Sequence, residues 1–186
     1  HIGENRVNEL TEKYNDYDKS AELHFIGTLQ TNKVKYIIDK VSLIHSVDTV
    51  GLLKEINKRA EKINKVMDIL LEVNSGKEEN KSGIMPEDVR EFYELTKEYK
   101  NIRVRGLMTM APRCNSREEY LKYFSLTKEL FDELFKNDEN AILSMGMSES
   151  YRPAIAAGAS IVRLGSSVFG RTTADMMNLK NKTNDK

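Results

Sequence analysis

Hydrophobic and polar positions in this 186-residue chain follow two alternating patterns. Short apolar runs, typical of strands, alternate with longer segments whose apolar residues recur at the spacing of one helix face. The short runs predict strands at 1–5, 23–27, 42–47, 66–74, 102–109, 141–146 and 160–165. Strands that alternate with helices in this way predict parallel βαβ units and an α/β fold.

The longer segments predict helices at 7–20, 31–41 and 49–65. Two further helices carry start signals. Proline is tolerated in the first turn of a helix, so Pro86 predicts a helix that continues to about Tyr99. Ser116 and Glu119 have the spacing of a capping box, which predicts the start of a helix that runs to about Leu134.

The predicted strands also separate into an apolar and a more polar face. In 69–74 the apolar positions alternate with a face that carries Glu72, and His24, Ser46 and Arg105 join this polar face by the same alternation. A polar interior near the C-terminal ends of the strands is typical of a barrel active site, because interior charge is costly unless it is paired or used. The alternative is a structural ion pair between Glu72 and Arg105.

The strand count bears on how the sheet closes. Seven strands are predicted, whereas a closed (β/α)8 barrel needs eight. Either the sheet is open, or one βα unit precedes His1. Because the chain begins with His1 rather than Met, we expect the second arrangement.

The most informative chemistry lies in 141–148 and 160–170, two apolar runs that end in glycine and serine where a helix should begin. Backbone N–H groups, hydroxyls and a helix dipole at such a turn form a phosphate site, and the last two strands of α/β barrels commonly carry one. Ser148 is also a candidate N-cap of the following helix. The alternative is two ordinary strand-to-helix turns. The predicted phosphate ligands are Ser144, Gly146, Met147, Ser148, Gly165 and Ser166.

Composition limits the partners. The 29 basic and 29 acidic residues cancel, so no nucleic acid or membrane surface is expected as a partner. The single cysteine, Cys114, suits a reducing cytoplasm, and no apolar run approaches the roughly 20 residues of a membrane span. No cluster of residues has the spacing of a metal site, so no metal is expected.

With these features in view, the chain resembles the pyridoxal phosphate homeostasis proteins, which have the barrel of the alanine racemase N-terminal domain. Any one matching segment would be weak, but together they follow the family order over residues 1 to about 170. They include Gly-Glu-Asn at 3–5, His-Phe-Ile-Gly at 24–27, His-Ser-Val-Asp at 45–48, Lys-Ser-Gly-Ile at 81–84, Ser-Met-Gly-Met-Ser at 144–148 and Val-Arg-Leu-Gly at 162–165.

The resemblance implies a (β/α)8 barrel of the fold-type III kind over residues 1–172, with a C-terminal tail at 173–186. Its cofactor would be pyridoxal 5′-phosphate (PLP). The family's Schiff-base lysine lies on the first barrel strand, in a segment that nothing in this chain matches, so the resemblance implies a lysine upstream of His1 and no covalent attachment here. Lys81 matches a family position, but it is a poor substitute because ordinary lysines are solvated.

The resemblance also implies roles for two further residues. Asn5 would contact the cofactor near its ring substituents, and Arg163 would face the pyridine nitrogen. A permanently charged guanidinium there keeps the nitrogen unprotonated and weakens the ring as an electron sink, which suits a carrier better than a racemase. The alternative for Arg163 is a structural pair with Glu72. His24 is interpreted as an oriented core histidine rather than a general base.

Three hypotheses for function follow. The first is a PLP-binding homeostasis protein, a monomer or homodimer, that buffers the cofactor and delivers it to apoenzymes without a catalytic cycle of its own. The second is an amino-acid racemase, but only 16 residues follow Gly170 in this chain, too few for the extra β domain that such racemases use. The third is another barrel enzyme that binds a phosphate ligand.

Overall fold

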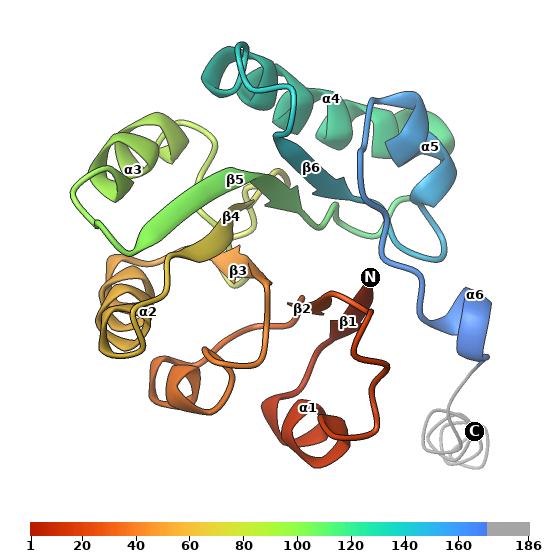
Figure 1. The fold of residues 1–186 in the computed structure, drawn as a ribbon. Coiled ribbons are helices and arrows are strands. Elements are labelled where there is room, and N and C mark those ends of the chain that lie inside the picture. The colour runs from red at the N-terminus through yellow and green to blue at the C-terminus, as the bar shows by residue number, and fades with distance from the viewer. Residues whose placement is uncertain (171–186) are drawn as a thin grey trace.

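Six parallel strands form one curved sheet, and helices surround its outer side (Figure 1). The computed structural model describes residues 1–170. The strands lie in the sheet in their sequence order, from β1 to β6, as successive βαβ units with crossover helices require. The architecture is therefore an α/β half-barrel.

The strands are β1 (Ile2–Glu4), β2 (Leu23–Phe25), β3 (Leu43–Val47), β4 (Met67–Val73), β5 (Ile102–Thr109) and β6 (Ile142–Met145). The helices are α1 (Val7–Lys13), the 3-10 helix η1 (Thr31–Tyr36), α2 (Val50–Lys62), α3 (Val89–Thr96), α4 (Arg117–Leu134), α5 (Tyr151–Ala156) and α6 (Ser166–Phe169). The predicted tail 173–186 lies outside the described residues.

The predicted seventh strand at 160–165 is wrong as a strand. It contributes one parallel bridge, between Ile161 and Ser144, and the amide of Arg163 donates to the carbonyl of Gly146 at 3.0 Å. Pairing ends there because Gly146 has a φ of +93°, which turns the chain out of β6. Among residues 1–170 the sheet therefore has six strands, and the closed eight-stranded barrel is not present.

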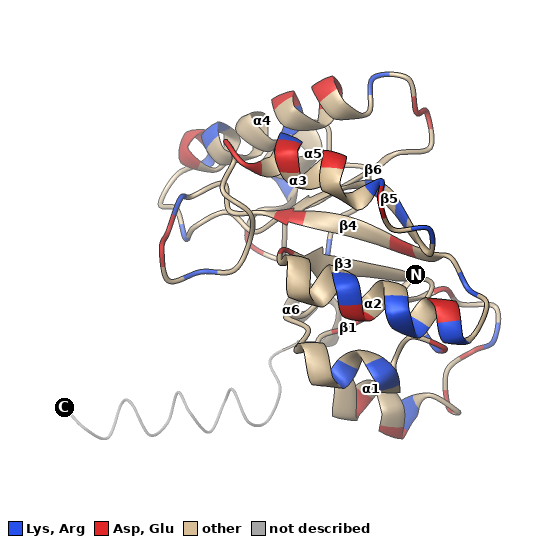
Figure 2. Cartoon of the chain, turned by 90° about the vertical axis from the view of Figure 1, so that its left-hand side faces the viewer, with Lys and Arg blue, Asp and Glu red and all other residues tan. Residues whose placement is uncertain are grey.

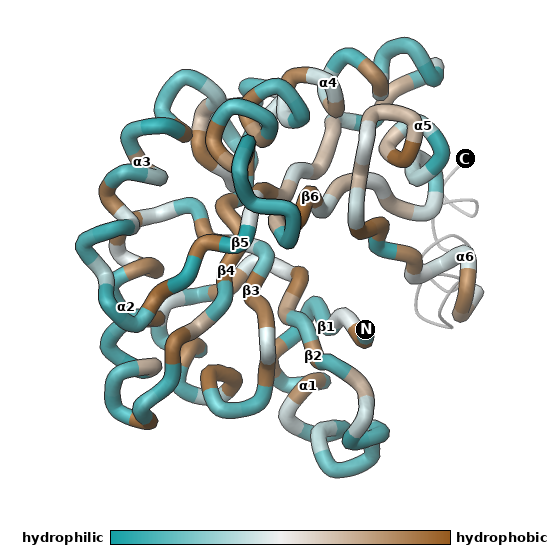
Figure 3. The backbone as a smooth tube through the Cα atoms, turned by 45° about the horizontal axis from the view of Figure 1, so that its top comes forward, coloured by the Kyte–Doolittle hydropathy of each residue, from teal (hydrophilic) through white to brown (hydrophobic). Residues whose placement is uncertain are grey.

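The two predicted strand faces are confirmed. Ile69, Leu71 and Val73 belong to the main core between the sheet and its helices, whereas Leu70 packs with Met108 on the inner face. Apolar positions follow the strands, and polar positions follow the outer sides of the helices (Figure 3). The outer core therefore holds the helices on the sheet, and the inner face is free to carry polar groups.

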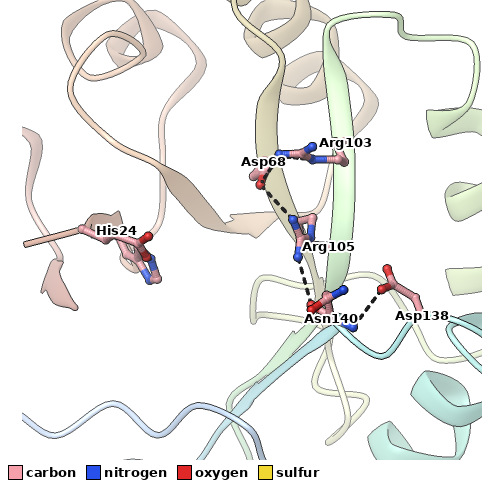
Figure 4. A network of polar contacts seen from close by, with 7 residues as sticks. His24, Asp68, Arg103, Arg105, Asp138 and Asn140 are labelled. Carbon is pink, nitrogen blue, oxygen red and sulfur yellow. Dashed lines mark hydrogen bonds and ion pairs between the residues drawn. The ribbon is translucent and has the colours of Figure 1, made fainter.

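The alternative, an ion pair between Glu72 and Arg105, is wrong. Arg105 is the extra residue of a bulge in β5, since Ile69 pairs with Val104 but Leu70 pairs with Gly106. Its guanidinium turns toward the start of the strands and contacts Asp68 at 3.4 Å, while Arg103 contacts the same carboxylate at 2.6 Å. Figure 4 shows this network, in which Arg105 also donates to the carbonyl oxygen of Asn140.

Candidate functional site

One turn follows β6, and the other follows residues 160–165, the segment that makes the single bridge to β6. The two turns lie side by side. Besides the Ile161–Ser144 bridge, the amide of Ser167 donates to the hydroxyl oxygen of Ser148 at 3.2 Å, which ties the second turn to the first. The structure therefore brings together the two glycine–serine turns that the sequence analysis singled out. The amides of Ser148, Gly165 and Ser166 make no hydrogen bond within residues 1–170 and are left for a ligand.

Glycine is present in these two turns for different structural reasons. Gly146 is required by the fold, because its φ is +93° and a Cβ there would lie 2.5 Å from the Cβ of Ala154. Gly165 has no such requirement, since its φ is −107° and a Cβ would meet no atom within 4 Å. A Cβ at Gly165 would point into open space, so a phosphate held by the neighbouring amides could approach the backbone closely there.

The prediction that Ser148 caps the next helix is wrong. Helix α5 begins at Tyr151, and the residue before it is Ser150, whose hydroxyl accepts the amide of Met147 at 3.1 Å. The turn folds back on itself before the helix starts, which frees Ser148 to join the second turn. Because α5 has 6 residues and α6 has 4, their dipoles add little, and any anion would rely on backbone amides, hydroxyls and a cation.

Arg163 supplies that cation. Its side chain is half-buried and donates from Nη1 to Ser144 Oγ at 2.8 Å and from Nη2 to the carbonyl oxygen of Thr109 at 3.1 Å. Burial lowers the pKa of the guanidinium, and the nearby Glu72 opposes this effect. The guanidinium is thus anchored beside the first turn, while its position against a pyridine nitrogen stays a prediction.

Glu72 does not form an ion pair with Arg163 among the described residues. Its Oε1 instead accepts a hydrogen bond from the Ser82 hydroxyl at 2.9 Å. Burial raises the pKa of this carboxyl, the charge of Asp48 adds to the rise, and Ser82 and Arg163 oppose it. The alternative in which Arg163 serves only to pair with Glu72 is therefore not supported by a direct contact.

A chain of side chains extends from Ser144 across the inner face. Ser144 Oγ lies 3.0 Å from His45 Nδ1, and His45 Nε2 lies 3.1 Å from His24 Nδ1. Sequence reasoning assigned no role to His45, although its segment was part of the family resemblance, because the contact joins residues 99 positions apart. Both rings are buried, which agrees with the interpretation of His24 as an oriented core histidine.

The pH dependence of stability should report on His45. Burial, together with the charges of His24 and Arg163, lowers its pKa from 6.5 to about 3. A histidine with a lowered folded-state pKa stabilises the fold above its unfolded pKa, and this contribution is lost as the pH falls through the window from 6.5 toward 3. We expect His45 to contribute a slope approaching 1.4 kcal/mol per pH unit there.

Urea unfolding of the unchanged chain and of His45→Gln at pH 7.5 and 5.5 measures this slope. The loss of stability at pH 5.5 should be smaller in the variant. The opposite contribution of Glu72 is present in both proteins and cancels in the difference. An equal pH dependence in the two proteins would contradict the assignment.

The remaining predicted contacts are less tightly grouped. Asn5 is exposed just after β1 and makes no side-chain hydrogen bond within residues 1–170. Met147 and Ser166 are exposed on their turns, and Lys81 is exposed in the loop after β4. Asn5, Met147 and Ser166 are open to a ligand, so their cofactor roles stay predictions.

The surface outside the site has no dominant charge. Basic and acidic residues are interspersed along the helices in Figure 2, which agrees with the balanced composition. Within the described residues, no helix combines the length and the apolar character needed to cross a bilayer.

Comparison with known proteins identifies the class. The sequence matches the alanine racemase N-terminal domain over residues 1–173. It is 50% identical to the pyridoxal phosphate homeostasis protein of Aquifex aeolicus over 171 residues, which cover 90% of this chain and 75% of that protein. The corresponding Helicobacter pylori protein is 39% identical and covers the chain equally well. The chain therefore belongs to the pyridoxal phosphate homeostasis protein family.

A solved structure supports the same assignment. PipY of Synechococcus elongatus with PLP bound superposes with a TM-score of 0.80 at 30% identity, covering 91% of this chain and 81% of that one. The structure of PipY without PLP gives a TM-score of 0.83. The similarity extends over nearly all of the described half-barrel.

Proposed function

We propose that this chain binds PLP through its phosphate and takes part in PLP homeostasis, without a catalytic cycle of its own. The observation that carries the proposal is the joining of two glycine–serine turns around Ser144 and Arg163, in a family whose member PipY has been solved with PLP bound. The relatives named above are homeostasis proteins, which favours this reading over a racemase.

The charges around the turns suit a phosphate dianion. The amides of Ser148, Gly165 and Ser166, which are not bonded within residues 1–170, would supply hydrogen bonds, and Arg163 would supply a positive charge held in place by Ser144. The nearest buried acid, Glu72, has a raised pKa, so its carboxyl repels an incoming anion less than an ordinary glutamate would. The proposed ligand set is Asn5, Ser144, Gly146, Met147, Ser148, Arg163, Gly165 and Ser166.

The finer architecture belongs to the same proposal. We place the half-barrel within a (β/α)8 barrel whose domain covers 1–172 here, completed by a βα unit beside β1 that carries the Schiff-base lysine. The protein would act in the cytoplasm as a reservoir that passes PLP to apoenzymes. On this view the described chain holds the phosphate subsite and binds PLP without a covalent bond.

Titration with two related ligands tests the proposal. PLP forms adducts with surface lysines, whereas pyridoxine 5′-phosphate has no aldehyde and reports the phosphate and ring contacts alone. We expect saturable binding of both, competition by inorganic phosphate, and no single lysine adduct after borohydride reduction and peptide mapping. Absence of saturable binding of pyridoxine 5′-phosphate would refute the phosphate subsite, and a stoichiometric adduct on Lys81 would refute non-covalent attachment.

Gly165→Val tests this close approach to the backbone directly. The added side chain meets no protein atom within 4 Å of its Cβ, so the unfolding free energy should stay within about 1 kcal/mol of the original. Binding of pyridoxine 5′-phosphate should weaken by about 10-fold or more, because the side chain fills the space of the phosphate. Calorimetric titration measures the affinity, and unchanged affinity in a folded variant would show that Gly165 is not part of the site.

A further inference from the structure

All three histidines of the chain lie in one row on the inner face of the sheet. The rings of His1 and His24 stack with centroids 4.7 Å apart, and His24 contacts His45. The three residues come from β3, β2 and the position just before β1. This row uses every histidine in the chain and extends away from the phosphate turns. The proposed phosphate site therefore does not explain it.

The parallel register of β1 and β2 also brings an acid to this row. Ile2 pairs with Leu23, so His1 and Glu22 are neighbours across the two strands on one face, and His24 lies two residues further along that face. The residue opposite His24 is Gly3, which has no side chain to separate the two imidazole rings. The fold thus gathers two imidazoles and one carboxylate from segments 21 residues apart.

The distances suit one small cation. His1 Nδ1, Glu22 Oε2 and His24 Nε2 all lie within 4.8 Å of one another. The carboxylate oxygen is 2.8 Å from His1 Nδ1 and 3.8 Å from His24 Nε2. Ligands about 2.0–2.1 Å from a tetrahedral zinc ion are separated by about 3.3 Å, which falls between these two distances.

One ligand is rigid and the other two can adjust. The His24 side chain is 6% exposed and is held by His45, whereas those of His1 and Glu22 are 54% and 61% exposed. His24 is visible in Figure 4, standing apart from the Asp68–Arg105 network on the other side of the view. Because the His1 ring is stacked on that of His24, it would turn out of the stack to bring Nδ1 to a cation at His24 Nε2, and its exposure leaves room for that rotation.

Beyond the ligands, the contacts between the histidines allow the hydrogen-bond direction that a metal requires. A metal on His24 Nε2 leaves the proton on Nδ1, which then donates to His45 Nε2, and His45 Nδ1–H donates in turn to Ser144 Oγ. Ser144 already accepts from Arg163, so its own proton becomes free to donate to a ligand at the turns. The same chain of contacts thus orients the metal ligand and links it to the phosphate turns.

We propose that His1, Glu22 and His24 form a binding site for Zn²⁺ or a similar divalent transition metal, with His45 as the residue that positions His24. Three protein ligands leave the fourth tetrahedral position to water or another small ligand. The sequence analysis expected no metal cluster, because spacing along the chain does not reveal ligands that only the register of β1 and β2 unites. The site does not depend on the proposed PLP function.

Calorimetric titration with Zn²⁺ in a phosphate-free buffer at pH 7.5, with Co²⁺ as a spectroscopic substitute, tests the site. We expect one ion per chain and a Co²⁺ absorption spectrum typical of nitrogen and oxygen ligands. Glu22→Gln, at an exposed position, should fold normally and weaken binding by about 10-fold or more, and His45→Gln should weaken it by about 10- to 100-fold. Glu12→Gln, an exposed acid on α1, is the matched control and should bind as the unchanged chain does.

One further control separates the His1 side chain from the terminal amine. A chain with one added residue before His1 moves the α-amino group away and should keep its affinity. Loss of binding in that chain would assign the metal to the amine and overturn the proposal. So would the absence of stoichiometric binding, or equal affinities of Glu22→Gln and the unchanged chain.

Discussion

Replacing Arg163 with methionine is expected to weaken binding of pyridoxine 5′-phosphate by about 100-fold or more. The guanidinium is anchored by Ser144 and the carbonyl of Thr109, so it is the fixed positive charge beside the two turns. Truncating one member of a buried, hydrogen-bonded charge pair costs about 2–5 kcal/mol, and each 1.4 kcal/mol is tenfold in affinity. Calorimetric titration of the folded variant measures the change.

Two further variants separate the effect of where Arg163 lies from the effect of its positive charge. Arg152→Gln removes an exposed arginine of α5 that stacks on Tyr151, and it should leave the affinity within about twofold. Arg163→Lys keeps the charge but loses the two-pronged contact, so its affinity should fall between those of the unchanged chain and Arg163→Met. If Arg163→Met folds and binds as tightly as the unchanged chain, the phosphate site has been placed wrongly.

The second large effect concerns folding. Gly106→Val should destabilise the chain by at least about 3 kcal/mol, a large part of the total stability of a single domain. Gly106 has a φ of +147°, and a Cβ there would lie 1.9 Å from the carbonyl oxygen of Ile142 in β6. The substitution therefore separates β5 from β6 just where the bulge at Arg105 ends. Urea unfolding followed by circular dichroism measures the loss.

Gly51 provides a control for this prediction. It lies in the first turn of α2, and a Cβ there would meet no atom within 4 Å. Gly51→Ala should stabilise the chain by up to about 1 kcal/mol, since alanine loses less backbone entropy on folding. Similar effects from the two substitutions would mean that close contact between β5 and β6 does not determine stability.

The contacts of Ser144 connect the anchored Arg163 with the histidine row. Ser144 accepts a hydrogen bond from Arg163 and also faces His45, so the phosphate turns and the histidine row share one hydroxyl. Metal binding at His24 and ligand binding at the turns can therefore be measured separately and then together. A change in the affinity for pyridoxine 5′-phosphate when Zn²⁺ is present would measure the coupling between them.

The sequence by itself determined the order of the elements, the faces of the strands and the location of the two turns. These are local properties: alternation of Ile69, Leu71 and Val73 with Leu70 and Glu72 reflects the two-residue period of a strand. Glycine and serine after an apolar run mark a turn wherever the run lies in the fold. The family resemblance added the expected ligand and the role of Arg163, which neither composition nor period could supply.

Only the tertiary structure decided the contacts that join distant segments. The bulge in β5 sends Arg105 to Asp68 instead of Glu72, and the folded-back turn replaces Ser148 by Ser150 before α5. The register of β1 and β2 places His1 beside Glu22 and His24. A shift of one residue along a strand reverses the direction of every later side chain, so periodicity predicts a face but not which partners meet across it.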